Sequence, residues 1–298
     1  MTGGVDEQKL SPRQVKARAL WLTLNEIEAF LSLAGDDSLG ATRKIPSEEL
    51  PDAPFYLAGQ PEFSRLMNEY VVEQQRWPEP YKAMGVKMPN GVLLHGPRGS
   101  GKTFALRKLA EFLSWRVVDF TLGAVGSPYI HQTSSRFRKL FADAEASGPT
   151  ILVMNEIDAM ASGRTDRSDD YKVEEINELL GLVEGAADRG ILVAGTTNRR
   201  EAIDSAFLRK GRFDLQLEIK YPDEKQSIEL LRALIEERPH VPGLNFEPLA
   251  RQFSGRPVSD IEWAVNEAAR LAVRSGKDAL DDICLFNALA RMKKEPLG

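Results

Sequence analysis

The sequence has few of the features that mark secreted, membrane-spanning or nucleic-acid-coating proteins. Its 298 residues include one cysteine, Cys284, so no disulfide can form within one chain, and a reducing compartment is expected. No apolar run approaches the roughly 20 residues of a membrane-spanning helix, and the first residues lack the apolar core of a signal peptide. The net charge of −5 argues against a generally basic surface. These absences predict a cytoplasmic protein with no membrane partner, and they disfavour nucleic acid as a partner.

A glycine-rich segment, residues 96–103, is the most informative part of the chain. It reads G-P-R-G-S-G-K-T and lies between an apolar run, residues 92–94, and a helical pattern, residues 104–113. Strand, glycine-rich turn and helix form the context of a phosphate-binding loop, whose backbone N–H groups face phosphate oxygens. We therefore predict an ATP site with Lys102 on the β- and γ-phosphates and the Thr103 hydroxyl on Mg²⁺. The candidate phosphate-binding residues are Gly96, Pro97, Arg98, Gly99, Ser100, Gly101, Lys102 and Thr103.

Polar side chains follow two later apolar segments that we expect to be buried strands. Asn155 and Glu156 come directly after residues 150–154, and Asn198 follows residues 190–195. Beside a phosphate loop, Glu156 is the candidate base that polarises the attacking water, and Asn155 occupies the position next to the metal. Asn198 could bridge that water and the γ-phosphate. Asp158, by contrast, is expected to cap a helix or turn.

Two arginines, Arg209 and Arg212, stand three positions apart before another strand pattern. Arginines so placed could reach a phosphate held by a neighbouring subunit. On spacing alone, however, ordinary surface salt bridges explain them better.

The order of the patterns predicts an α/β fold. Strand patterns alternate with helical ones, which is typical of a P-loop NTPase parallel sheet with helices on both faces. The expected strands are residues 92–94, 115–121, 150–154, 190–195 and 215–219. From Asp223 onward every pattern is helical, which predicts a small all-α lid domain.

Three parts follow from this organisation: an N-terminal helix and linker (1–54), a large α/β domain (55–221) and the lid domain (222–298). The apolar stripe of the expected helix at residues 11–33 is compatible with packing on its own domain and with docking of a partner or substrate.

Taken in order, these stretches resemble the AAA ATPases over about four-fifths of the chain, residues 55–292. The matching stretches are G-V-L-L-H-G-P-R-G-S-G-K-T, I-L-V-M-N-E-I-D-A, G-T-T-N-R, D-S-A-F-L-R-K-G-R-F-D and S-G-R-P-V-S-D-I-E-W-A-V-N-E-A-A-R. The resemblance implies that Glu156 is the catalytic base and Asn198 a sensor. It also makes Arg209 and Arg212 arginine fingers acting in trans, which implies a ring, usually a homo-hexamer. Gly59 and Arg256 become additional candidate nucleotide contacts.

The resemblance also points to a polypeptide substrate. Members carry a pore-loop aromatic twelve positions before the phenylalanine of the next helix, and here Tyr129, followed by Ile130, stands twelve before Phe141. Tyrosines around a ring could grip an extended chain; packing of Tyr129 within its own loop is the simpler alternative. A second pore loop is expected at residues 162–171.

Two departures from the family pattern matter. Asn155 replaces the usual aspartate, which predicts weaker metal binding and slow hydrolysis with ATP binding largely kept; a natural variant and an engineered substitution both fit. Arg256 in S-G-R-P resembles the lid sensor of HORMA-remodelling AAA proteins, so a HORMA-domain protein is a candidate substrate. Other stretches look closer to the membrane protease and unfoldase branch, but the zinc motif H-E-x-x-H does not occur.

The favoured interpretation is a hexameric, ATP-dependent protein-remodelling or unfolding ATPase that threads its substrate past Tyr129. The alternatives are an ATP-binding assembly scaffold with little turnover, supported by Asn155, and a nucleic-acid-linked AAA loader, which the acidic charge disfavours.

Overall fold

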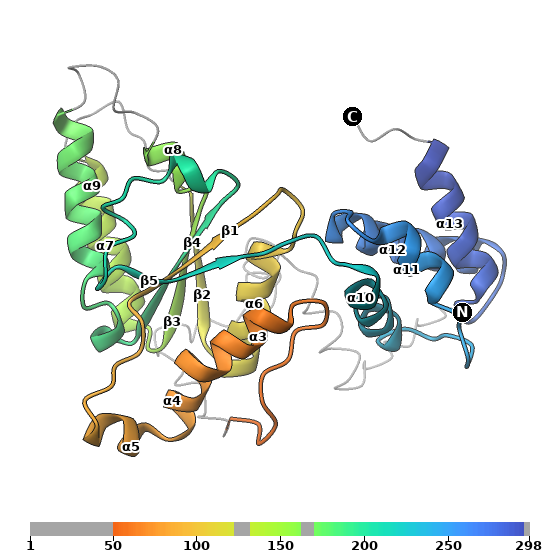
Figure 1. Cartoon of the computed structure of the whole chain (residues 1–298), viewed down its shortest axis with the longest axis horizontal. Helices are drawn as coiled ribbons and strands as arrows, with labels where there is room; N and C mark the ends of the chain where they lie inside the picture. The colour runs from red at the N-terminus through yellow and green to blue at the C-terminus, as the bar shows by residue number, and fades with distance from the viewer. Residues whose placement is uncertain (1–49, 122–131, 162–169, 295–298) are drawn as a thin grey trace, which may run out of the picture. The chain divides into compact units, whose positions relative to one another are not determined.

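The computed structural model describes residues 50–121, 132–161 and 170–294 (Figure 1). The expected helix at 11–33, the pore-loop residues Tyr129 and Ile130, and most of the second pore-loop segment lie outside the described residues. From Leu50 on, the described residues belong to one compact unit.

A five-stranded sheet forms the centre of the large domain, in the order β2-β3-β4-β1-β5. All four strand pairs are parallel, as the alternating pattern predicted. The strands are β1 (Gly91–His95), β2 (Arg116–Thr121), β3 (Thr150–Asn155), β4 (Ile191–Thr197) and β5 (Phe213–Glu218). The central strands read as continuous apolar runs because helices cover both of their faces. The predicted α/β fold is confirmed.

Helices cover the two faces of this sheet in two layers, with α7 and α9 on one side and α3 and α6 on the other (Figure 1). Alternate residues of β1 serve the two layers: Val92 and Leu94 pack with Leu106 of α6, whereas Leu93 packs with Phe141 of α7. This alternation follows from the two-residue period of a strand. The helices are α3 (Pro61–Met67), α4 (Glu73–Arg76), α5 (Pro78–Ala83), α6 (Lys102–Leu113), α7 (Gln132–Ala146), α8 (Asp158–Ala161) and α9 (Asp170–Val183).

Between β5 and residue 294, four helices with a core of their own follow, which confirms the all-α lid. They are α10 (Glu224–Glu236), α11 (Glu247–Phe253), α12 (Val258–Arg274) and α13 (Asp282–Lys294). Leu231, Phe253, Ile261 and Leu285 lie at the centre of this core and are at most 1% exposed. The boundaries at residues 54 and 221 remain predictions.

Two short helices have a local explanation. Pro78 separates α4, which ends at Arg76, from α5, of which it is the first residue. Proline is tolerated there because the first N–H groups of a helix have no partner within the helix. Helix α8 was not predicted, since four residues are too few to show a helical period. Within the described ranges, no helix is long and apolar enough to cross a membrane.

Candidate nucleotide-binding site

The phosphate loop connects β1 to α6, and its glycines are needed for its shape. Gly96, Gly99 and Gly101 have φ angles of 142°, 74° and 94°, where side chains are strained. At Gly96 there is no room either, because a Cβ atom would lie 2.2 Å from the carbonyl oxygen of Ile219. The loop is therefore confined between β1 and the chain that leaves β5.

Lys102 joins the loop to the end of β4. It is the first residue of α6, and its Nζ donates to the carbonyl oxygens of Gly96 (2.9 Å) and Pro97 (2.8 Å) and to Oδ1 of Asn198 (2.9 Å). Burial lowers the pKa of Lys102, with the charge of Asp158 acting in the opposite direction. The structure thus brings together two site residues that lie 96 positions apart in the sequence.

Thr103 and Asn155 also meet, at the carboxyl end of β3. Oδ1 of Asn155 accepts from the Thr103 hydroxyl at 3.2 Å and from the Thr196 hydroxyl at 3.2 Å. Thr196 was not singled out from the sequence. It belongs to the T-T preceding Asn198, and only the neighbouring positions of β3 and β4 in the sheet bring it to Asn155.

Glu156 lies at the same edge of the sheet with an unusual backbone. Its φ is 53°, a left-handed conformation that non-glycine residues rarely adopt and that costs about 1–3 kcal/mol. The Ile157 N–H, donating to the Thr196 carbonyl at 3.0 Å, fixes the turn between β3 and α8. The residue is exposed, and no hydrogen bond or ion pair within the described part of the chain occupies its carboxylate. Such a free carboxylate is available to orient a water molecule.

Asp158 has a role that the expected cap does not describe. It is the first residue of α8 and is buried, and its oxygens accept from the Thr197 hydroxyl (2.8 Å) and from Nε of Arg199 (3.0 Å). The Arg199 N–H also donates to the Thr197 hydroxyl at 2.9 Å. Asp158 therefore holds the residues on both sides of Asn198, which fixes the backbone of that candidate sensor.

The two candidate fingers have different surroundings. Arg212 is largely buried, with its side chain 18% exposed, and donates to Glu184 (2.7 Å) and to the Ala206 carbonyl (2.8 Å). Arg209 is exposed and has no partner among the described residues. The salt-bridge interpretation therefore applies to Arg212 within this chain, whereas Arg209 is the arginine available to another molecule.

The lid contacts the phosphate loop directly. The Val258 N–H, at the start of α12, donates to the Gly99 carbonyl at 2.8 Å. At the end of the large domain, the Tyr221 hydroxyl donates to the Arg98 carbonyl at 2.9 Å. Nearby, the Arg256 side chain is 42% exposed and lies 3.8 Å from Asp260. It is accessible for a further contact.

Gly59 lies against the lid rather than in the phosphate loop. Its N–H donates to Glu229 of α10 at 3.3 Å, and the same carboxylate oxygen accepts from the Tyr56 hydroxyl at 2.9 Å. A Cβ at Gly59 would approach Cγ of Leu230 to 2.6 Å. The glycine is therefore required by its close contact with α10, whatever it contributes to nucleotide binding.

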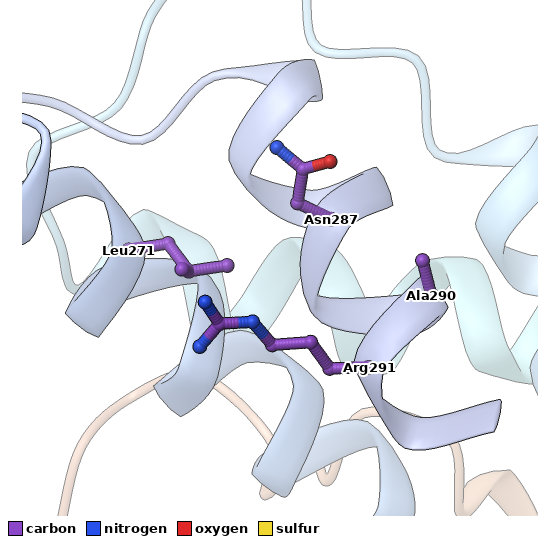
Figure 2. Close-up of a pocket in the computed structure, with 4 residues that line it drawn as sticks. All are labelled: Leu271, Asn287, Ala290 and Arg291. Carbon is purple, nitrogen blue, oxygen red and sulfur yellow. The ribbon is translucent and has the colours of Figure 1, made fainter. Parts of the chain in front are cut away.

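A separate hollow of about 270 Å³ lies between α12 and α13 and is lined by Leu271, Asn287, Ala290 and Arg291. Figure 2 shows the Arg291 side chain extending from α13 towards Leu271. The guanidinium is held by the buried carboxylate of Glu267 at 2.6 Å. None of the candidate nucleotide residues lines this hollow.

A parallel sheet in which the inner strand β1 leads through a glycine-rich loop into a helix beginning Lys-Thr defines a P-loop nucleotide-binding protein, here with a helical lid. Residues 92–221 match the model of the ATPase family associated with various cellular activities (AAA). The chain therefore contains an AAA ATPase domain over these residues.

Similar proteins include proteases and cell-division-cycle homologues. An ATP-dependent zinc metalloprotease FtsH 3 of Sphaerobacter thermophilus is 33% identical over 260 residues, which cover 86% of this chain and 53% of the relative. A Cell division cycle protein 48 homolog of Archaeoglobus fulgidus is 32% identical over 238 residues, covering 78% of this chain and 32% of the relative. The chain thus spans about half, or less, of the length of these relatives.

Proposed function

We propose that this chain hydrolyses ATP to remodel or unfold proteins. The observation that carries the proposal is the meeting of three groups at the carboxyl edge of the sheet: the Lys102–Asn198 pair, the hydroxyl of Thr103 and the unoccupied carboxylate of Glu156. A cation, a metal-directed hydroxyl and a base are the parts that phosphoryl transfer to water requires.

Each residue has a distinct task in this proposal. Lys102 exchanges its loop carbonyls for oxygens of the β- and γ-phosphates, and Asn198, released from Lys102, positions the attacking water against the γ-phosphate. Glu156 accepts a proton from that water. Thr103 would hold Mg²⁺, which neutralises charge on the phosphates when bound. The donor set fits this metal in part, because the carboxamide of Asn155 stands where a carboxylate would accept hydrogen bonds from metal-bound water.

The exposed Arg209 supports a ring in which it completes the site of a neighbouring subunit. Arg212, fixed by Glu184, would keep the segment that carries Arg209 in place. We infer a homo-hexamer from the family resemblance, with ATP at each interface.

A mixing experiment tests this shared site. The Lys102→Ala variant cannot hold phosphate but supplies Arg209, while Arg209→Ala holds phosphate but supplies no finger. Each variant alone should lose at least about 100-fold in turnover, as arginine fingers generally contribute that much or more. Randomly mixed rings at equal amounts should recover about a quarter of wild-type turnover, because one interface in four pairs a competent loop with a finger.

A matched control is Arg274→Ala, which removes another exposed arginine without a partner among the described residues, at the end of α12. Turnover in this variant should stay within about twofold of wild type. If the Lys102→Ala and Arg209→Ala mixture recovers nothing, the shared site is refuted. If wild type forms no product at any protein concentration, the ATPase itself is refuted.

The substrate in this proposal is a polypeptide gripped by Tyr129 and Ile130, and a HORMA-domain protein is one candidate on the strength of Arg256. A second function, an ATP-binding scaffold with little turnover, is supported by Asn155. Substituting Tyr129 by alanine separates the two. A motor should keep basal ATP hydrolysis but lose its stimulation by an unfolded polypeptide such as casein, whereas a scaffold should show no stimulation before or after the substitution. A nucleic-acid loader remains disfavoured by the acidic charge, and a cytoplasmic location remains a prediction from the sequence.

A further inference from the structure

The side chain of Asn155 is oriented by two hydroxyl groups. Its single carboxamide oxygen accepts from Thr103 and from Thr196, each at 3.2 Å. An amide oxygen has two lone pairs, so these two bonds use its full acceptor capacity. Asn155 therefore keeps no acceptor for hydrogen bonds from the water shell of a metal ion.

The NH₂ group of the same side chain is left with its two donors. Within the described part of the chain, Nδ2 has no hydrogen-bond acceptor, and Asn155 is only partly buried at the edge of the phosphate loop. The nearby carboxylate of Asp158 is engaged by Thr197 and Arg199. The amide donors are therefore available to a ligand at this edge of the sheet, where Lys102 and the loop would place phosphates.

The chemistry of the two possible neighbours decides what this amide favours. Water bound to a metal ion donates hydrogen bonds, and the amide N–H groups cannot accept them. Phosphate oxygens only accept, and the amide N–H groups suit them. The neutral side chain also lacks the negative charge with which a carboxylate would repel phosphates that carry no metal.

The geometry points to a nucleotide site that binds ATP almost independently of Mg²⁺, with Asn155 donating to a phosphate oxygen. This inference rests on the proposed nucleotide site and defines its ligand as the metal-free as well as the metal-bound nucleoside triphosphate. It concerns binding; turnover still depends on the metal.

Calorimetric titration of the full chain with ATP, in excess Mg²⁺ and in excess EDTA, tests the inference. For the wild type, the two dissociation constants should agree within about threefold. For Asn155→Asp, which has the same shape but adds a charge, metal-free ATP should bind at least about tenfold more weakly than Mg·ATP. Asn155→Ala removes the donors without adding a charge, and should weaken metal-free binding about tenfold relative to wild type. Lys102→Ala controls for binding elsewhere.

Three results would count against the inference in different ways. Equal metal dependence in wild type and Asn155→Asp would overturn it, since the amide would then be turned with its oxygen towards the metal. Unchanged metal-free affinity in Asn155→Ala would overturn the hydrogen bond to phosphate. If wild type binds ATP under neither condition, the nucleotide function itself fails, and the inference fails with it.

Discussion

Replacing Gly96 by alanine should damage the fold as well as the site, for reasons visible at one atom. The added Cβ would lie 2.2 Å from the Ile219 carbonyl oxygen, whereas ordinary contacts are 3.4–4 Å, so the backbone must move by more than an ångström. That movement would strain two adjacent hydrogen bonds, from the Gly96 N–H to the Thr197 carbonyl (3.2 Å) and from the Ile219 N–H to the His95 carbonyl (2.7 Å). The strained φ adds about 1–2 kcal/mol and the crowding about 1–3 kcal/mol.

Together these two terms predict that the free energy of unfolding falls by about 2–5 kcal/mol. At this chain length, that corresponds to a thermal unfolding midpoint lower by about 5–15 °C. Thermal unfolding followed by circular dichroism measures the midpoint. The control is Gly148→Ala, because Gly148 also has a positive φ, 86°, but nothing lies within 4 Å of its Cβ position. It should lose only the backbone term, about 2–5 °C. If both substitutions lower the midpoint equally, the steric argument for the loop is wrong.

Three further predictions concern charged side chains. Asp158→Asn places an amide against Arg199, beside the sensor. Turnover should fall about tenfold, while the dissociation constant for ATP should change less than about twofold. If kinetic and binding titrations show turnover and the dissociation constant changing by the same factor, the positioning role is contradicted. Asp223→Ala removes the capping box of α10 and should lower stability by about 1 kcal/mol in urea unfolding; an unchanged midpoint would contradict it. Hydrogen bonds from the Lys277 ammonium and from the Cys284 N–H lower the pKa of Asp281 to about 2, so the stabilisation by these contacts is complete above about pH 4 and is lost as the pH falls towards 2. In Lys277→Gln, the urea concentration at the unfolding midpoint should fall less steeply between pH 4 and pH 2 than in the wild type; an unchanged acid profile would contradict the pairing.

The fold could be predicted largely because its signals are local. The buried strands read as apolar runs, and β3, predicted at residues 150–154, is observed as Thr150–Asn155. The phosphate loop was recognisable for the same reason: its glycines and Lys102 are adjacent in sequence and need no distant partner to be identified.

The parts of the site that sequence reasoning missed depend on distant partners. Arg209 and Arg212 look alike in sequence, and the ion pair of Arg212 with Glu184, 28 positions earlier, distinguishes them only in the folded chain. Asp158 reaches Thr197 across 39 positions. The left-handed backbone of Glu156 had no sequence signal, because a glutamate does not favour that conformation.

The hydrogen bond from the Val258 N–H to the Gly99 carbonyl attaches the first turn of helix α12 to the phosphate loop. The helix has 17 residues and is therefore roughly 25 Å long, at about 1.5 Å per residue. A tilt of only about 10° at its first turn, where it contacts the loop, would displace its far end by roughly 4 Å. Because α13 shares its core, it would move as well. An adjustment of the loop too small to alter the sheet could thus shift the outer surface of the lid by the width of a side chain.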